Sequence, residues 1–214
     1  MSVRVRTKIC GITTPEQAVA VTRLGADALG LVFVEKSARY LTLSAAREVR
    51  DAVPPFIQVV ALFLDAPMAQ VEQTIDEIQP DMLQFHGSES VLDCERWRRP
   101  YLRAVAMGSQ PDLAGVAGSY TGASGFLLDG HKKGELGGQG TAFDWSTVPA
   151  TLGKPVILAG GLNPSNVGQA IRTTNPYGVD VSSGVESAPG IKDLNLVREF
   201  ISEVNRATGC QEDN

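Results

Sequence analysis

Val5-Arg6-Thr7-Lys8-Ile9-Cys10-Gly11 is a short alternating apolar run that ends in a cysteine and a glycine, and residues 15–24 behind it carry apolar side chains at helical spacing. A strand followed by an amphipathic helix makes one βα unit. The same alternation continues along the chain without a linker. It gives eight strand-sized runs: 5–9, 27–33, 56–63, 81–85, 101–106, 125–128, 155–159 and 178–181.

Helix-sized segments accompany these runs: 15–24, 44–52, 68–78, 89–98, 111–117, a weak one near Trp145, 164–172 and 192–205. Eight βα units in 214 residues predict an α/β protein with a single-domain (β/α)8 TIM barrel, whereas a flavodoxin-like sheet would need fewer units. We expect the barrel to span residues 1–207 and residues 208–214 to form a polar C-terminal tail.

The composition favours a small-molecule partner. Hydrophobic residues make up 43% of the chain, and 19 basic against 24 acidic residues give a net charge of -5, which provides no basic surface for nucleic acid or an anionic membrane. We find neither a membrane-length apolar run nor a signal peptide, and the three cysteines have unrelated spacings, so we expect a cytoplasmic protein. Nothing in the sequence demands a second subunit, and we expect a monomer.

Glycines and serines follow the last two predicted strands, at the end of a barrel where ligands bind. The two stretches are 158–162 (LAGGL) and 180–186 (DVSSGVE). Backbone N–H groups of glycines approach an anion closely, serine hydroxyls add donors, and a short helix after the last strand would add its positive end. We therefore expect a phosphate site here, although glycines also permit tight turns that bind nothing.

Cys10 and Asp129 each end a predicted strand, and strands one and six of an eight-stranded ring lie three steps apart. The two side chains are expected on opposing sides of a ligand, which suits the acid and base of a proton-shifting isomerase. Apolar residues before Asp129 favour its protonated form, although a loop-capping carboxylate fits equally. The role of Cys10 stays open, because free cysteine is commonly a buried hydrophobe. We expect Lys8 to point away from it.

Three further residues are weighed as ligand contacts. Arg39 offers a planar fork for a carboxylate, but it is also consistent with a solvated loop charge. His86 suits either a ligand hydroxyl or a bond to a neighbouring loop. His131 is given no role, although residues 130–140 around it resemble a loop that closes over the mouth. A metal site is not expected, because the chain has two histidines and no cysteine at ligand spacing.

Seven ordered motifs, taken together, resemble the phosphoribosylanthranilate isomerase family over nearly the whole chain. They are KICGIT (8–13), KSAR (36–39), LQFHG (83–87), LLD (127–129), GGQG (137–140) before FDW (143–145), AGGL (159–162) and VDVSSGVE (179–186) before KD (192–193). The resemblance implies conversion of N-(5-phosphoribosyl)anthranilate to its ribulose isomer in tryptophan biosynthesis, by an Amadori rearrangement that needs no metal or organic cofactor.

The resemblance also implies residue roles. Cys10 would be the general base and Asp129 the general acid, while Arg39 would hold the anthranilate carboxylate. The phosphate end would be lined by Gly160, Gly161, Asp180, Ser182, Ser183 and Gly184. Two alternatives are another phosphosugar enzyme of the same fold and a barrel that binds a phosphate ligand without converting it.

Overall fold

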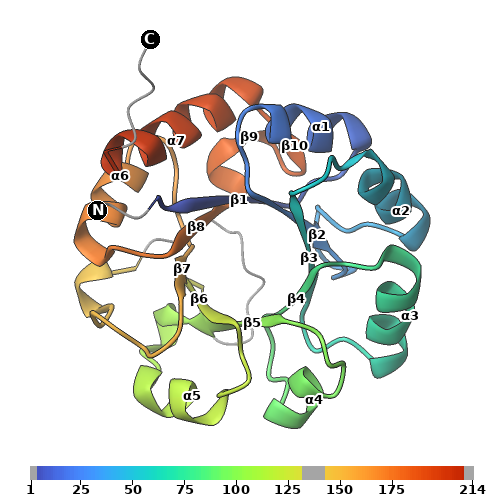
Figure 1. The fold of residues 1–214 in the computed structure, drawn as a ribbon, viewed down its shortest axis with the longest axis horizontal. Helices are drawn as coiled ribbons and strands as arrows, with labels where there is room; N and C mark the ends of the chain where they lie inside the picture. The colour runs from blue at the N-terminus through green and yellow to red at the C-terminus, as the bar shows by residue number, and fades with distance from the viewer. Residues whose placement is uncertain (1–3, 132–142, 210–214) are drawn as a thin grey trace.

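A computed structural model of the protein, which describes residues 4–131 and 143–209, has a closed barrel of eight parallel strands (Figure 1). This confirms the predicted (β/α)8 architecture. The strands are β1 (Arg6–Cys10), β2 (Ala28–Val32), β3 (Gln58–Phe63), β4 (Met82–Phe85), β5 (Tyr101–Ala106), β6 (Gly125–Asp129), β7 (Val156–Leu158) and β8 (Gly178–Val181).

Helices surround the barrel on its outside (Figure 1). They are α1 (Pro15–Arg23), α2 (Leu43–Ala52), α3 (Met68–Ile78), α4 (Val91–Glu95), α5 (Leu113–Ser119), α6 (Val167–Thr174) and α7 (Leu194–Ala207). Three short 3-10 turns join them: η1 (Met107–Ser109), η2 (Trp145–Thr147) and η3 (Ser183–Val185). The weak helix predicted near Trp145 is therefore one 3-10 turn, and α4 is shorter than the predicted 89–98.

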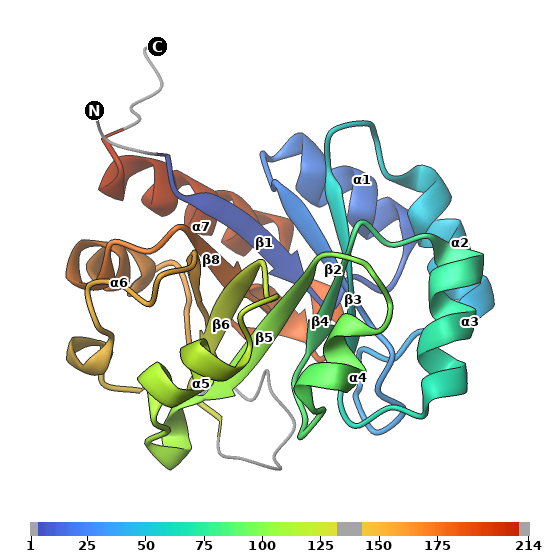
Figure 2. The same ribbon diagram turned by 60° about the horizontal axis from the view of Figure 1, so that its bottom comes forward.

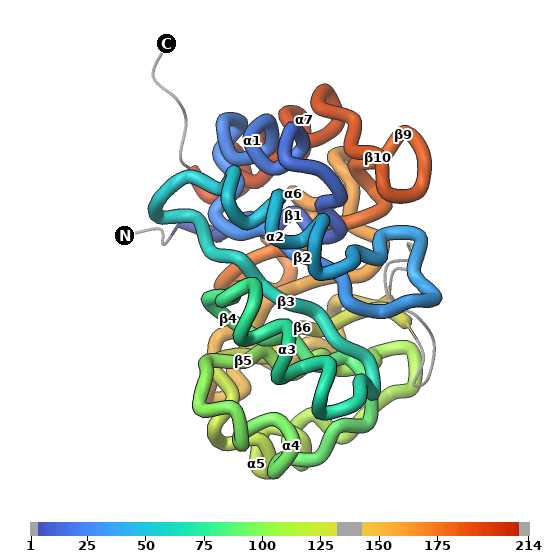
Figure 3. The backbone as a smooth tube through the Cα atoms, turned by 90° about the vertical axis from the view of Figure 1, so that its right-hand side faces the viewer, coloured from blue at the N-terminus to red at the C-terminus, as the bar shows by residue number. Residues whose placement is uncertain are grey.

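The region after β8 differs from the prediction of a helix beginning at residue 192. A two-stranded antiparallel hairpin, β9 (Glu186–Ala188) and β10 (Ile191–Lys192), comes first, and it lies beyond the C-terminal ends of the barrel strands in Figure 3. Helix α7 then begins at Leu194, because the Asp193 carboxylate accepts hydrogen bonds from the backbone N–H groups of Asn195 and Leu196.

The main core lies between the outer faces of the strands and the helices. Helix α7 shows why: it buries Val197, Phe200, Ile201 and Val204, a stripe at the spacing i, i+3, i+4 and i+7. Figure 2 shows this helix running alongside β1 and β8. A second, smaller apolar cluster fills part of the barrel interior: Leu102, Ala104, Leu127, Ile157 and Ala159.

Two predictions fall wholly or partly on residues that are not described. The polar tail from residue 210 onward, which includes Cys210, and most of the predicted closing loop at 130–140 lie outside the described residues. Within residues 4–131 and 143–209, no helix combines the length and apolar character that crossing a bilayer requires.

Candidate active site

A pocket opens at the C-terminal ends of the barrel strands, and nine of the ten predicted site residues line it. They are Cys10, Arg39, His86, Asp129, Gly160, Gly161, Asp180, Ser182 and Ser183. Apolar side chains of β2, β3 and the loops after them complete its wall, among them Val32, Leu62 and Leu64. A few polar groups converging on an apolar concavity are typical of a small-molecule site.

Gly184, the tenth residue, lies just behind this wall. A Cβ on Gly184 would collide with the carbonyl oxygen of Leu162, so the loop after β8 packs directly on the loop after β7. Its glycine therefore allows the two predicted phosphate loops to sit side by side.

Cys10 ends β1 with its thiol inside the barrel, 5% exposed. Burial raises the pKa of the Cys10 thiol above its usual value, and Lys8 and Lys192 oppose that rise. Near neutral pH the group is therefore a thiol in the ligand-free protein. Ser182 donates a hydrogen bond of 3.0 Å from its hydroxyl to the Cys10 carbonyl oxygen, which ties β1 to the loop after β8.

The expectation that Lys8 points away from Cys10 is wrong. Side chains alternate along a strand, so residues two apart share a face, and Lys8 enters the barrel beside Cys10 with 6% exposure. Its Nζ lies 2.9 Å from Oδ1 of Asp180, which is also buried. Burial would lower the pKa of Lys8, but the charges of Asp180 and Cys10 outweigh it and the pKa is raised.

Asp129, at the end of β6, is buried at 6% exposure and lines the pocket from the side opposite β1. The expectation that its surroundings favour the protonated form is also wrong. Burial raises the pKa of Asp129, but interactions with His131 and His86 outweigh burial, and the pKa lies below its usual value. The group is a carboxylate in the ligand-free protein.

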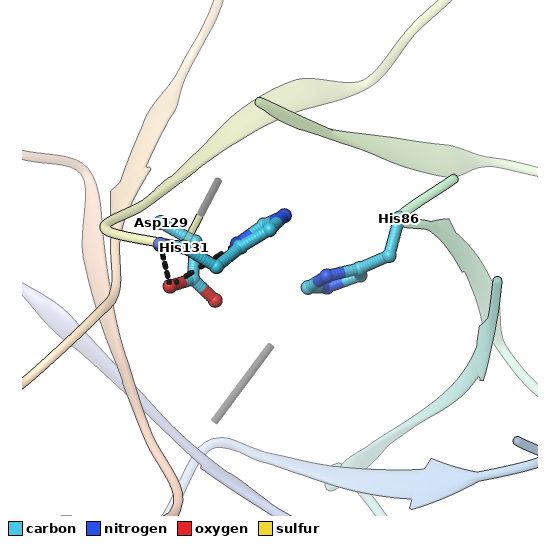
Figure 4. Close-up of side chains that lie close together, drawn as sticks. All are labelled: His86, Asp129 and His131. Carbon is cyan, nitrogen blue, oxygen red and sulfur yellow. Dashed lines mark hydrogen bonds and ion pairs between the residues drawn. The ribbon is translucent and has the colours of Figure 1, made fainter. Parts of the chain in front are cut away.

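Both histidines of the chain gather at Asp129, as Figure 4 shows. The backbone N–H of His131 donates to Asp129 Oδ1 over 3.3 Å, and its ring Nδ1 lies 3.4 Å from the same oxygen. The ring of His86, which hydrogen-bonds the Gln84 amide, stacks on the ring of His131 with centroids 5.6 Å apart. Burial lowers the pKa of His86 to about 3, so its ring is neutral.

Ligand atoms of His86, Asp129 and His131 lie within 4.8 Å of one another, close enough to consider a metal ion. The two rings are nearly parallel, at an interplanar angle of 24°. Their nitrogen lone pairs lie in the ring planes and so run side by side instead of converging on one point. This arrangement does not favour a metal centre at these residues.

Arg39 reaches over Gly11 to the pocket, but its fork is already engaged. Its Nε and Nη2 donate to the two carboxylate oxygens of Glu186 over 2.8 and 2.7 Å. Lys192 donates to the same carboxylate over 2.6 Å. Burial raises the pKa of Glu186, but these two cations outweigh it, and the pKa lies below its usual value. A ligand carboxylate would have to share or replace this contact.

The predicted phosphate loops have the backbone that an anion site needs. Gly160 and Gly161 have φ values of +79° and +65°, a region that other residues rarely adopt. A Cβ on Gly160 would lie 2.9 Å from Oδ1 of Asp129, so this loop and the acid residue touch. Ser183 begins η3, directly after β8. Asp180 lines the same pocket, but its carboxylate is paired with Lys8.

Four residues of the site were not assigned from the sequence: Lys8, His131, Glu186 and Lys192. The alternation of β1 could have revealed Lys8, since its spacing of two from Cys10 fixes their common face. The other three join the site through contacts between segments distant in sequence, such as Arg39 with Glu186, and no local pattern indicates them.

The chain is similar to known proteins over almost its entire length. Residues 7–203 match the family model described as N-(5'-phosphoribosyl)anthranilate isomerase. An N-(5'-phosphoribosyl)anthranilate isomerase from Pseudomonas aeruginosa strain UCBPP-PA14 is 52% identical over 200 residues, which are 94% of this chain and 95% of the relative.

Solved structures give the same result. The phosphoribosyl anthranilate isomerase of Thermotoga maritima superposes with a TM-score of 0.86 at 37% identity, covering 94% of this chain and 99% of its own. A second structure, at 34% identity and a TM-score of 0.82, covers 96% of this chain and 99% of its own. It is of a phosphoribosyl anthranilate isomerase in complex with reduced 1-(o-carboxyphenylamino)-1-deoxyribulose 5-phosphate.

Proposed function

The chain belongs to the N-(5'-phosphoribosyl)anthranilate isomerase family, and from this premise we propose that Cys10 and Asp129 are the base and the acid of its reaction. The enzyme isomerises N-(5'-phosphoribosyl)anthranilate in tryptophan biosynthesis. The observation that carries the assignment of residues is the shared pocket, which Cys10 and Asp129 line from opposite sides of the barrel.

Asp129 acts first in the proposed mechanism. Its carboxyl group gives a proton to the furanose ring oxygen, the bond between that oxygen and C1 breaks, and the nitrogen lone pair forms an iminium at C1. Asp129 therefore has to be protonated when substrate is bound, which its ligand-free pKa does not favour. A substrate phosphate near Gly160 would raise that pKa, because a negative charge disfavours a second one beside it.

Cys10 acts second. Its thiolate takes the proton from C2, the C2–H electrons form the C1–C2 double bond, and the iminium is neutralised to an enolamine. The enolamine then tautomerises to the ketone of 1-(2-carboxyphenylamino)-1-deoxyribulose 5-phosphate. The positive iminium nitrogen accepts the electrons at each step, so the substrate itself stabilises the developing charge.

The two ends of the substrate would be held apart by two groups of residues. The phosphate would bind at Gly160, Gly161, Ser182, Ser183 and Gly184, with Asp180 at the edge of this site. The anthranilate carboxylate would bind Arg39, and His86 would contact the ribose hydroxyls. Fixing both ends keeps C2 beside the thiol, and such positioning lowers the barrier for proton transfer.

Cys10→Ala tests the base, and Cys94→Ala is its matched control. Cys94 is the other described cysteine; it is buried in α4, outside the pocket, and burial raises its pKa to about 12. We expect Cys10→Ala to slow the fluorescence decay of phosphoribosylanthranilate on the order of a hundredfold or more. Cys94→Ala should retain activity close to that of the unmodified protein.

Substrate carrying deuterium at C2 distinguishes a base from a residue that only packs the site. Removal of the C2 proton by Cys10 predicts a primary isotope effect in single-turnover reactions and loss of the label from C2 of the product. Robust turnover by Cys10→Ala, or full retention of deuterium at C2, would contradict the assignment.

The remaining expectations are proposals of the same kind: a monomer, a cytoplasmic location, and one domain over residues 1–207. Sedimentation equilibrium tests the monomer directly. Phe56, whose side chain is fully exposed after α2, is a described apolar group that a second copy would cover. A dimer that dissociates in the Phe56→Ser variant would contradict the expectation.

A further inference from the structure

Lys8 and Asp180 form a buried ion pair below the pocket, and the mechanism above gives Lys8 no task. Their side chains are 7% and 9% exposed. Removing two charges from water costs free energy that their attraction does not always repay, so a buried pair is weak evidence for a stabilising role. The position of this pair suggests a different one.

The strand register fixes what Lys8 faces. In the pairing of β1 with β8, Lys8 lies opposite Asp180, and in the pairing of β1 with β2, Cys10 lies opposite Gly30. Lys8 and Cys10 share the inner face of β1 because they are two residues apart. The ammonium therefore has the carboxylate on one side and the base residue above it.

Gly30 supplies the space in which the sulfur and the ammonium meet. A Cβ on Gly30 would lie 2.6 Å from the Cys10 sulfur and 3.0 Å from the Lys8 Nζ. Both atoms thus rest against the same point of β2, where any other residue would put a side chain. This common void brings the positive charge next to the sulfur.

We propose that Lys8 is a positioning residue, held by Asp180, whose ammonium stands beside the Cys10 sulfur and stabilises its thiolate form for proton abstraction. The proposal rests on the proposed role of Cys10 as the base. Asp180, in this view, orients Lys8 and limits the effect of its charge.

The other charged groups around Cys10 are consistent with this division. Lys192 and Arg39 interact with the sulfur from the β9–β10 and β2 sides, and both are also bound to Glu186. Among the neighbours that favour the thiolate, Lys8 has the largest effect on the pKa of Cys10, and Asp180 acts in the opposite direction. The two members of one ion pair are therefore expected to move the thiol in opposite senses.

The test is the pH dependence of Cys10 alkylation by iodoacetamide, followed by mass spectrometry in a Cys94→Ser, Cys210→Ser background. Only the thiolate reacts, so the rate at pH 7.5 measures its population without any turnover. We expect Lys8→Gln to slow alkylation about tenfold or more, since an opposite charge this close shifts a pKa by about one unit or more. Lys8→Arg should stay within about threefold of the parent, and Asp180→Asn should be faster.

A structural role alone would change these rates in the same direction or not at all. Equal alkylation rates for the parent and a folded Lys8→Gln variant would overturn the proposal. If Lys8→Gln does not fold, the Lys8→Gln/Asp180→Asn double variant is compared with Asp180→Asn alone. Slower alkylation of the double variant supports the proposal, and equal rates overturn it.

The same variants separate this proposal from the role of Cys10. The alkylation pattern above, combined with full turnover by Cys10→Ala, would mean that Lys8 tunes a thiol which is not the base. A kcat/KM profile whose alkaline limb moves to higher pH in Lys8→Gln would join the two roles.

Discussion

The β1 side and the β6 side of the pocket each bury one ionisable group, but the pKa values of the two groups move in opposite directions. On the β1 side burial outweighs the cations near Cys10, and the thiol pKa rises. On the β6 side the histidines outweigh burial, and the pKa of Asp129 falls. The neighbours of Cys10 that matter most, Lys8 and Asp180, sit on strands, whereas His131 follows the end of β6.

The difference has a consequence for catalysis. The ligand-free protein carries a thiol and a carboxylate near neutral pH, while the reaction needs a thiolate and a carboxylic acid. The competent pair is therefore a minor form. Its fraction is constant between the two pKa values, because raising the pH produces thiolate and consumes carboxylic acid in equal proportion.

Asp129→Asn gives the largest expected effect. The amide cannot supply the proton, so kcat/KM should fall about a hundredfold to ten-thousandfold, the range of general acid catalysis. The acid limb of the pH profile, which reports Asp129, should disappear, while the alkaline limb of Cys10 stays. The measurement is fluorescence decay of the substrate from about pH 4 to 10, within the range set by the reference pKa values. Near-normal rates in a folded variant would remove Asp129 from the mechanism.

Gly30→Ala tests the β1 side without changing an ionisable group. The new methyl would press on the Cys10 sulfur and the Lys8 Nζ, so one of them has to move. We expect kcat/KM to fall about tenfold to a hundredfold, because small displacements of reacting groups are costly. The overpacking should also lower the free energy of unfolding by about 1–3 kcal/mol in urea titrations.

Gly118→Ala is a matched control for that substitution. Gly118 lies in α5, where a Cβ would meet no atom within 4 Å. It should leave activity unchanged. Equal losses in both variants would mean that the effect of Gly30→Ala does not come from the meeting of sulfur and ammonium.

The pH profile of the unmodified protein tests the comparison as a whole. A raised thiol pKa and a lowered carboxyl pKa predict a broad plateau in kcat/KM. The rate should fall at acid pH only below the usual pKa of aspartate, about 3.9, and at alkaline pH only above that of cysteine, about 8.5. A narrow bell with both limbs between those values would show that the ligand-free arrangement of the two sides is not the one substrate meets.

His131→Ala should give the smallest effect and the most specific one. Loss of its ring removes an interaction that lowers the pKa of Asp129, so the acid limb should move to higher pH. The carboxylic acid fraction would then rise, and kcat/KM on the plateau should stay within a few-fold of the parent or increase, since the change in pKa is one of the smaller kind. An unchanged acid limb would show that His131 does not act on Asp129.

The sequence by itself determined the barrel and most of the pocket. Strand and helix periodicity are local properties, and parallel strands in a ring bring their C-terminal ends together whatever the loops contain. Cys10, Asp129 and the loops after β7 and β8 could therefore be placed by position alone. The side of β1 on which Lys8 lies was also in the sequence, because alternation is fixed by the strand, and our expectation overlooked it.

Tertiary structure decided the charges in the pocket. The pKa of Asp129 depends on a histidine beyond its strand and on another from β4, and the fork of Arg39 depends on Glu186, 147 residues away. Burial and Coulomb interactions act through space and vary steeply with distance, so their balance has a sign only when the distances are known. The sequence named the acid and the base, but only the folded barrel determined which of them carries the proton before the substrate arrives.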